Sequence, residues 1–329
     1  AARVDCLPPR VKRVLQVAAV AGKHFSRPML AGCIDHPAQL PEHLELLERH
    51  DLIGRIAEHP HFRYGFRHDI IREVVYKSLL KKERRDLHQR LGMVMEERFT
   101  DSPDDAPEIL AFHFKHGKSP HKAIRYLIQS AGTSLRQYAV IEAHRFYREA
   151  YDLLTAPGRL TPHNTGELID LLNRWAPVFY FRGTFGELET LFRRHLPEAD
   201  TLDDLEKRGI YHVWLGASLW GIERFGDAYR FLRKALELGA QGNSRLVNGY
   251  AHTWLAWTCV DLGRMKEGLE HGKEARRLFA GAAWEHYPYF QSFDSDGYAY
   301  WALGACARVR ESGEKLLALG RTSSSIRGI

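Results

Sequence analysis

Three groups of residues in this 329-residue chain have types and spacings that could carry chemistry. The first is His116-Gly117-Lys118-Ser119, which contains the Gly-Lys-Ser of a phosphate-binding loop. A complete loop needs a glycine five places before Gly117, and Phe112 stands there. No apolar strand leads into the segment and Pro120 follows it directly. We therefore interpret it as a turn between two helices.

The second group is the histidines, of which the chain has 18. His113 and His116 share one face of a predicted helix, with His121 beyond its end, and His59 and His61 flank a predicted turn. A metal site needs three or four converging ligands, commonly with cysteine or acidic partners. The four cysteines are far apart and form no CxxC pair: Cys6, Cys33, Cys259 and Cys306. We predict no metal site and no cofactor, and cysteines kept reduced in a cytoplasmic compartment.

The sequence contains none of the common catalytic motifs that we searched for. The sequence contains no Gly-x-Ser-x-Gly, His-Glu-x-x-His or Gly-x-Gly-x-x-Gly pattern. The acidic pairs Asp104-Asp105 and Asp203-Asp204 lie in expected linkers or turns, where capping and solvation explain them. We predict no catalytic residues and expect that the chain is not itself an enzyme.

The third group is aromatic and crowds the last part of the chain. Rings at helical spacing usually pack between helices, but the inner surface of a helical array can also form an amphipathic groove for a peptide or small ligand. Polar residues interleave with these rings, including His252, Asp261 and Arg264. The residues predicted to bind a partner are Trp220, Arg224, Tyr250, Trp254, Trp257 and Trp301.

The first 68 residues have the pattern of a winged helix. Apolar stripes predict three short helices within residues 8–51, the second capped by Ser26 and the third opened by Pro41. Two β-prone segments, 52–56 and 62–66, flank Glu58-His59-Pro60-His61, which predicts a hairpin.

The second half of the chain repeats itself. When Gly183, Glu223, Gly263 and Gly304 are taken as equivalent, the steps are 40, 40 and 41 residues. Five places further on stand Leu188, Ala228, Gly268 and Val309, and twelve places on stand His195, Ala235, Ala275 and Leu316. A pair of antiparallel helices cannot bury its apolar stripe alone, so such pairs stack into a superhelix.

The predicted fold is therefore mainly all-α. It has an N-terminal winged helix with a small β-hairpin (1–68), connecting helices (69–105), and an α-α superhelix of tetratricopeptide-like repeats (106–329). The acidic segment Thr100–Pro107 is predicted to be a linker.

Two stretches of the first half resemble a known architecture. They are Tyr64–Leu80 with the Arg84-Arg85-Asp86-Leu87-His88 that follows, and Glu108–Phe114 with Ala123–Tyr126 and Glu142-Ala143. Together they resemble the region after the nucleotide-binding domain in bacterial signal-transduction ATPases of the STAND class, as in multidomain class III adenylate/guanylate cyclases and large LuxR-type regulators. The resemblance implies a winged helix followed by tetratricopeptide repeats. The family's Walker A, Walker B and cyclase residues have no counterpart here.

The net charge and the hydropathy of the chain limit the kinds of partner that we expect. A net charge of +6 permits contact with nucleic acid without demanding it. The predicted recognition helix, residues 41–50, carries three glutamates and one arginine, the wrong sign for phosphate. The basic run from Lys77 to Arg85 is the better candidate for contact with phosphate, although such runs are usually solvated.

No apolar stretch has the length of a membrane span. The two ends of the sequence lead us to expect a segment of a longer protein.

The leading hypothesis is a non-catalytic sensor or scaffold within a larger signalling ATPase. Its repeats would bind a protein, peptide or small effector, and the winged helix would relay occupancy to an upstream ATPase domain of the same chain. The alternative is a fragment of a DNA-binding transcriptional regulator. Nucleic acid and membrane are not among the partners that we expect.

Overall fold

The structure, a computed structural model, describes residues 4, 6–56, 63–99, 107–161, 164–280 and 287–323. It falls into two compact units, residues 1–154 and 155–329. The described residues are mainly helical, as predicted, and their one sheet has three strands.

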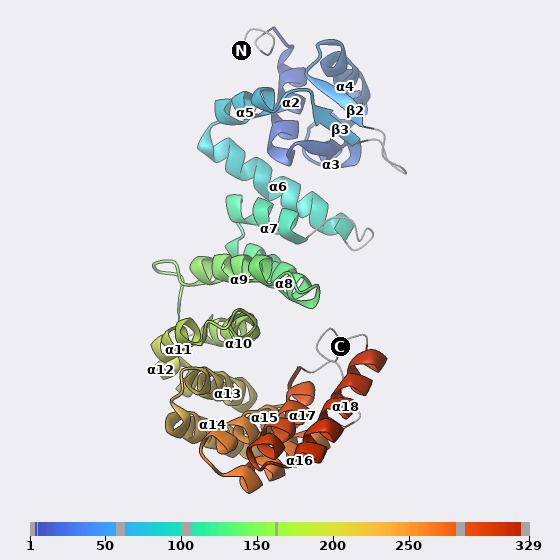
Figure 1. The fold of residues 1–329 in the computed structure, drawn as a ribbon. Helices are drawn as coiled ribbons and strands as arrows, with labels where there is room; N and C mark the ends of the chain where they lie inside the picture. Colours follow the sequence, from blue (N-terminus) through green and yellow to red (C-terminus); the bar gives the residue numbers. More distant parts are fainter. Residues whose placement is uncertain are drawn as a thin grey trace. The chain divides into compact units, whose positions relative to one another are not determined.

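The first unit begins with three helices and a small antiparallel sheet (Figure 1). These elements are α2 (Pro9–Ala21), β1 (His24–Ser26), α3 (Arg27–Ala31), η1 (Pro37–Gln39), α4 (Leu40–Arg49), β2 (Ile53–Ile56) and β3 (Arg63–Phe66). The strand order is β1-β3-β2, with Phe25 opposite Tyr64 and Gly54 opposite Gly65. The three predicted helices and the two hairpin strands are present, and β1 was not predicted. The predicted turn at 58–61 lies outside the described residues.

The apolar stripe of α2 forms the centre of this core. Leu15 and Val17 are fully buried, and the ring of Phe25 stacks on that of Tyr64 with centroids 6.0 Å apart. Ser26 caps α3, as predicted, because its Oγ accepts a hydrogen bond of 3.4 Å from the backbone N–H of Met29.

Five further helices follow among the described residues of the first unit: α5 (Asp69–Ser78), α6 (Lys81–Phe99), α7 (Pro107–His116), α8 (Pro120–Arg136) and α9 (Val140–Leu154). Residues 117–119 are the turn between α7 and α8, as predicted. The Nζ of Lys118 pairs with Asp86 at 2.6 Å, and its backbone N–H donates to Gln89 Oε1 at 2.8 Å. Lys118 therefore fixes this turn to α6. Of the predicted linker, only Pro107 is described, and it begins α7.

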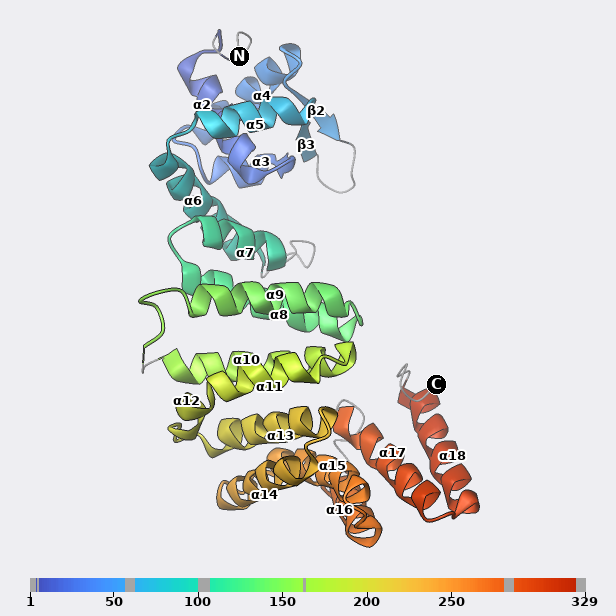
Figure 2. The ribbon, with the colours of Figure 1, turned by 60° about the vertical axis from the view of Figure 1, so that its left-hand side comes forward.

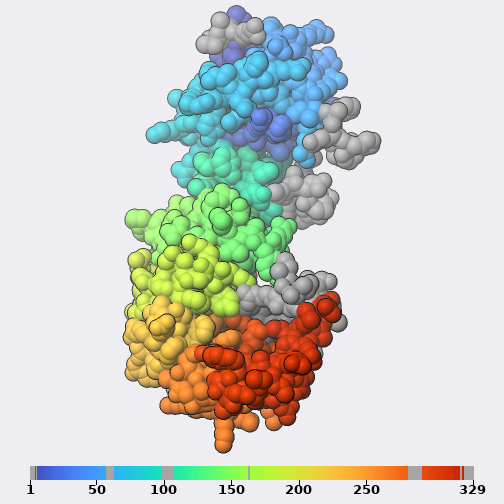
Figure 3. Space-filling model, in the orientation of Figure 1, coloured from blue at the N-terminus to red at the C-terminus, as the bar shows by residue number. Residues whose placement is uncertain are grey.

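The second unit is built from pairs of antiparallel helices (Figure 2). They are α10 (Thr165–Arg182), α11 (Phe185–Arg194), the short α12 (Leu196–Asp200), α13 (Leu205–Gly221), α14 (Phe225–Gln241), α15 (Arg245–Asp261), α16 (Met265–Phe279), α17 (Tyr287–Ala302) and α18 (Cys306–Ser323). The first helices, α10, α13, α15 and α17, each pack against the next. They form a continuous inner layer, and the last pair, in red, lies against the third pair, in orange (Figure 3).

The turn between the two helices of each pair explains the repeat period. Gly183, Glu223, Gly263 and Gly304 have φ angles of 68°, 63°, 78° and 70°, so all four adopt the left-handed conformation. The predicted equivalence of these positions is confirmed in the backbone. Ala228 stands five residues after the left-handed residue of its pair, and Ala235 and Ala275 stand twelve residues after theirs. These small side chains are fully buried between neighbouring helices.

Glu223 carries the conformational cost that glycine avoids at the other three turns. A non-glycine residue in the left-handed region costs about 1–2 kcal/mol, partly offset by the greater freedom of glycine in the unfolded chain. We expect Glu223→Gly to stabilise the second unit by about 0.5–1 kcal/mol, and Gly263→Ala to destabilise it by about 1 kcal/mol. A Cβ at Gly263 would meet no atom within 4 Å, so the test isolates the backbone. Urea unfolding measures both, and a destabilised Glu223→Gly protein contradicts the argument.

Candidate functional site

Five aromatic side chains line the inner layer of the second unit, and four of them form a continuous series of ring contacts. The aromatic wall consists of Tyr180, Trp220, Trp257, Tyr298 and Trp301. The ring centroids are 5.7 Å apart between Trp220 and Trp257, 5.4 Å between Trp257 and Tyr298, and 6.0 Å between Tyr298 and Trp301. Trp301 is 68% exposed, whereas the other four are half-buried. The wall thus has an open face at α17.

The repeat period places these rings in register. Tyr180, Trp220 and Trp301 each stand three residues before the left-handed residue of their pair, and Trp257 and Tyr298 each stand six residues before theirs. Successive first helices stack, so equivalent positions line up on one surface. The wall is a consequence of the period and of aromatic residues at two repeat positions.

The carboxylate of Asp261 lies within the wall. Trp220 Nε1 donates a hydrogen bond of 2.6 Å to Asp261 Oδ2, and the Tyr298 hydroxyl donates one of 2.9 Å to Asp261 Oδ1. The hydrogen bond from Tyr298 to Asp261 raises the pKa of that tyrosine. Within the described ranges, no lysine or arginine forms an ion pair with Asp261. The wall therefore combines aromatic faces with one negative charge that neutral donors hold in place.

Trp254 lies beneath the wall. It is 1% exposed, and its ring contacts those of Tyr180, Trp214 and Trp220 at centroid distances of 5.8, 6.3 and 5.4 Å. The buried Nε1 atoms of Trp254 and Trp257 have no hydrogen-bond acceptor among the described residues. Each is therefore a buried donor whose partner lies outside the described side chains.

One hydrogen bond joins the first and the last inner helices. Gln291 Nε2 on α17 donates to the Tyr180 hydroxyl on α10 at 2.9 Å, although 111 residues separate them. The Gln291 side chain is 3% exposed. The inner helices of the second unit therefore curve until the fourth contacts the first.

The structure divides the six predicted residues among three places. Trp220, Trp257 and Trp301 belong to the wall, and Trp254 is in the core below it. Tyr250 packs against Trp214 and Phe279, and burial raises its pKa to about 12. Arg224 lies in a separate cleft. The predicted binding residues did not include Tyr180 and Tyr298, which the repeat register could have supplied.

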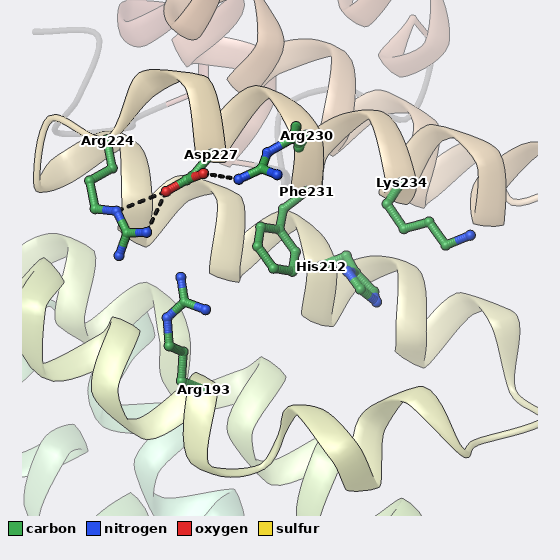
Figure 4. A pocket seen from close by; sticks show the side chains of 7 residues that line it. All are labelled: Arg193, His212, Arg224, Asp227, Arg230, Phe231 and Lys234. Atoms are coloured by element: carbon green, nitrogen blue, oxygen red, sulfur yellow. Dashed lines mark hydrogen bonds and ion pairs between the residues drawn. The ribbon is translucent and has the colours of Figure 1, made fainter.

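That cleft, the basic cleft, lies between α11, α13 and α14 and has a volume of about 350 Å³ (Figure 4). Its lining residues are Arg193, His212, Arg224, Asp227, Arg230, Phe231 and Lys234. Arg224 and Arg230 both pair with Asp227, and these hydrogen bonds lower the pKa of that carboxyl group. Arg193 pairs with Glu189. The three arginines of the cleft therefore already have carboxylate partners.

One cluster among the described residues has metal-ligand chemistry. It consists of Cys259 on α15 with Glu267 and His271 on α16, and its ligand atoms lie within 4.8 Å of one another. The sequence prediction of no metal site considered histidines close in sequence. It did not consider residues that the antiparallel pairing of α15 and α16 brings together.

No protein-family model matches the sequence. A curated relative, the uncharacterized protein R02095 of Rhizobium meliloti (strain 1021), is 26% identical over 230 residues. The match covers 69% of this chain and 22% of the relative, so the chain spans about a fifth of that protein's length.

Solved structures share the helical-repeat fold. A Rap protein solved in complex with competence and sporulation factor is 14% identical, with a TM-score of 0.54, over 95% of this chain and 77% of that one. Aspartyl phosphate phosphatase F from Bacillus subtilis is 11% identical, with a TM-score of 0.51. The match covers 94% of this chain and 84% of the phosphatase chain. A STAND protein with a tetratricopeptide repeat sensor from Pyrococcus horikoshii is 14% identical, with a TM-score of 0.47. The match covers 98% of this chain and 52% of the STAND protein. The fold is a superhelix of tetratricopeptide-like repeats, as predicted.

Among the residues that the structure describes, none of the helices is both long and apolar enough to cross a bilayer.

Proposed function

We propose that this chain is the effector-binding module of a larger signalling protein and that its second unit binds a peptide segment carrying an arginine or a lysine. The observation that carries the proposal is the aromatic wall with Asp261 at its centre. Aromatic faces attract cations by about 0.5–2 kcal/mol each, and a nearby carboxylate adds a charge partner.

Asp261 is suited to this role because its present partners are neutral. The Trp220 indole and the Tyr298 hydroxyl orient the carboxylate without cancelling its charge. A carboxylate has about four lone-pair sites, so it can accept further donors from a ligand.

The N-terminal elements support a relay to another domain. The order α2-β1-α3-α4-β2-β3, with strand order β1-β3-β2, supports the proposal that these elements are a winged helix. We propose that this winged helix relays occupancy of the repeats to an upstream ATPase domain, in line with the STAND resemblance. Such a relay requires that the ligand bind one arrangement of the modules better than another. A parent gene that encodes no ATPase or output domain beside this segment would contradict the relay.

The alternative of DNA binding has weaker support. In the proposed winged helix, α4 would be the recognition helix. It carries Glu42, Glu45 and Glu48, of which Glu48 pairs with Arg55 at 3.1 Å. Acidic side chains there repel phosphate. We propose no nucleic-acid partner, and retention of duplex DNA that weakens with salt would overturn this.

The test is selection of random peptides on the immobilised full chain, followed by affinity measurements on synthetic copies. We expect enriched sequences with an arginine or lysine beside apolar residues. Trp301→Ala should weaken their binding about tenfold, because the exposed ring offers a cation–π contact worth roughly 1–2 kcal/mol when desolvated. Asp261→Asn should weaken binding by a similar factor and reduce its dependence on salt.

The matched control is Ile141→Ala. Ile141 is an apolar side chain on α9 that is 78% exposed, outside the second unit. Its removal should leave peptide affinity unchanged. Failure to enrich any peptide, or equal binding by Trp301→Ala and Ile141→Ala, would defeat the proposal.

A further inference from the structure

Cys259, Glu267 and His271 converge between the two helices of the third repeat. Glu267 and His271 are four residues apart on α16 and so share one face of it, while Cys259 faces them from α15. The Nε2 of His271 lies 3.8 Å from Glu267 Oε1. The thiol of Cys259 is buried and hydrogen-bonds to Glu267.

The groups around this cluster orient each candidate ligand. His252 Nδ1 lies 2.8 Å from His271 Nδ1, so one of the two rings donates to the other. When His271 donates from Nδ1, its Nε2 presents a lone pair toward Glu267. The Tyr229 hydroxyl donates to Glu267 Oε1 at 2.8 Å, and Arg264 lies 3.7 Å from Oε2. A partner on the second nitrogen of a ligating histidine and a donor on a ligating carboxylate are typical of metal sites in proteins.

We propose that Cys259, Glu267 and His271 bind a zinc ion, with water as the fourth ligand. In tetrahedral zinc sites the metal-ligand distances of about 2.0–2.3 Å place ligand atoms roughly 3.3–3.8 Å apart. The ligand atoms of the cluster lie within 4.8 Å of one another, so a bound ion would need to draw them together by about 1 Å. Binding releases one proton from the Cys259 thiol, and the thiolate and the carboxylate then balance the charge of Zn²⁺.

The site would lie directly behind the aromatic wall. Cys259 stands two residues after Trp257 and two before Asp261 on α15, and a metal would fasten this end of α15 to α16. The ion would stabilise the third repeat whether or not the wall binds a peptide, so the inference stands independently of the proposed function.

Titration of the metal-free full chain with Co²⁺, a spectroscopic substitute for Zn²⁺, tests the proposal. The exposed Cys6 and Cys306 are first replaced by serine in every protein, so that only buried thiols remain. We expect one Co²⁺ per chain, a thiolate-to-cobalt charge-transfer band that Zn²⁺ abolishes, and a higher Tm with Zn²⁺. His252→Gln should weaken binding about 10–100-fold, as the loss of an orienting partner does.

Cys259→Ser is the decisive variant, and Cys33→Ser, which changes a buried thiol of the first unit, is its control. The band should disappear in the first and persist in the second, with unchanged helical circular dichroism in both. The absence of stoichiometric Co²⁺ binding to the parent protein would overturn the proposal. A band that survives in folded Cys259→Ser would also overturn it.

Discussion

Lowering the pH from 7 to 5 should destabilise the first unit by about 4 kcal/mol, because two neutral histidines are buried in it. His88 and His113 are each 1% exposed. Burial, reinforced by the neighbouring histidines, lowers the pKa of His88 to about 3. Burial also lowers the pKa of His113 to about 4.

Burial keeps both rings neutral, and a chain of hydrogen bonds connects them. The Tyr76 hydroxyl lies 3.0 Å from His88 Nε2, and His88 Nδ1 lies 3.0 Å from His113 Nδ1. His113 also bonds to the backbone of Ala21. This polar chain connects α5, α6 and α7 to the end of α2, so it links the N-terminal elements to the helices that follow them.

The direction of the effect follows from the two pKa values. Both lie below the value of about 6.5 for an unfolded histidine, so the unfolded chain binds more protons below pH 6.5. Each histidine therefore lowers the free energy of unfolding by roughly 2 kcal/mol at pH 5 relative to pH 7. The loss of stability continues until the pH falls through the pKa values of the folded state. Carboxylates contribute little in this interval because their unfolded pKa values are about 4.

Urea unfolding of the full chain at the two pH values measures the loss, and hydrogen exchange of α6 and α7 localises it. His121→Gln, at an exposed site on α8, should leave the dependence on pH unchanged. Equal stability of the first unit at pH 7 and pH 5 would show that the two buried histidines are not held neutral.

Replacing Trp254 by alanine should lower the unfolding free energy of the second unit by about 3–5 kcal/mol, the usual cost of truncating a fully buried large aromatic residue. The ring is 1% exposed and contacts three other aromatic side chains. Trp301→Ala should cost less than about 0.5 kcal/mol, because 68% of that side chain is in solvent. Chemical denaturation, followed by circular dichroism at the helical band, compares the two.

The difference in stability between the two variants decides which tryptophan can serve as a test of peptide binding. Loss of peptide binding in Trp254→Ala would report damage to the core, whereas the same loss in Trp301→Ala would report a missing contact. Comparable stabilities of the two variants would mean that Trp254 is not packed as the structure has it.

The repeat period and the helix stripes could be predicted from the sequence because they are local. Glycine at three of four equivalent turns indicates a left-handed residue, and the alignment assigns the same conformation to Glu223. Strand β1 was missed because three residues are too few to show an alternating pattern. The turn at 58–61 and the linker before Pro107 remain predictions.

The site depends on contacts that the sequence order does not reveal. The bond between Gln291 and Tyr180 depends on the curvature of the whole array, and the approach of Cys259 to His271 depends on the register of two antiparallel helices. The aromatic residues were recognisable as a group. Their division into core and wall follows from the distance of each to its turn: Trp214 and Trp254 stand nine residues before it and are buried.

Hydrogen exchange of the full chain, with and without a saturating selected peptide, tests the central claim most directly. The account predicts slower exchange at the end of α15 and at the end of α17, where Trp257, Asp261, Tyr298 and Trp301 lie. Protection confined to the basic cleft between α11 and α14, or to the first unit, would contradict it and would place the effector away from the aromatic wall.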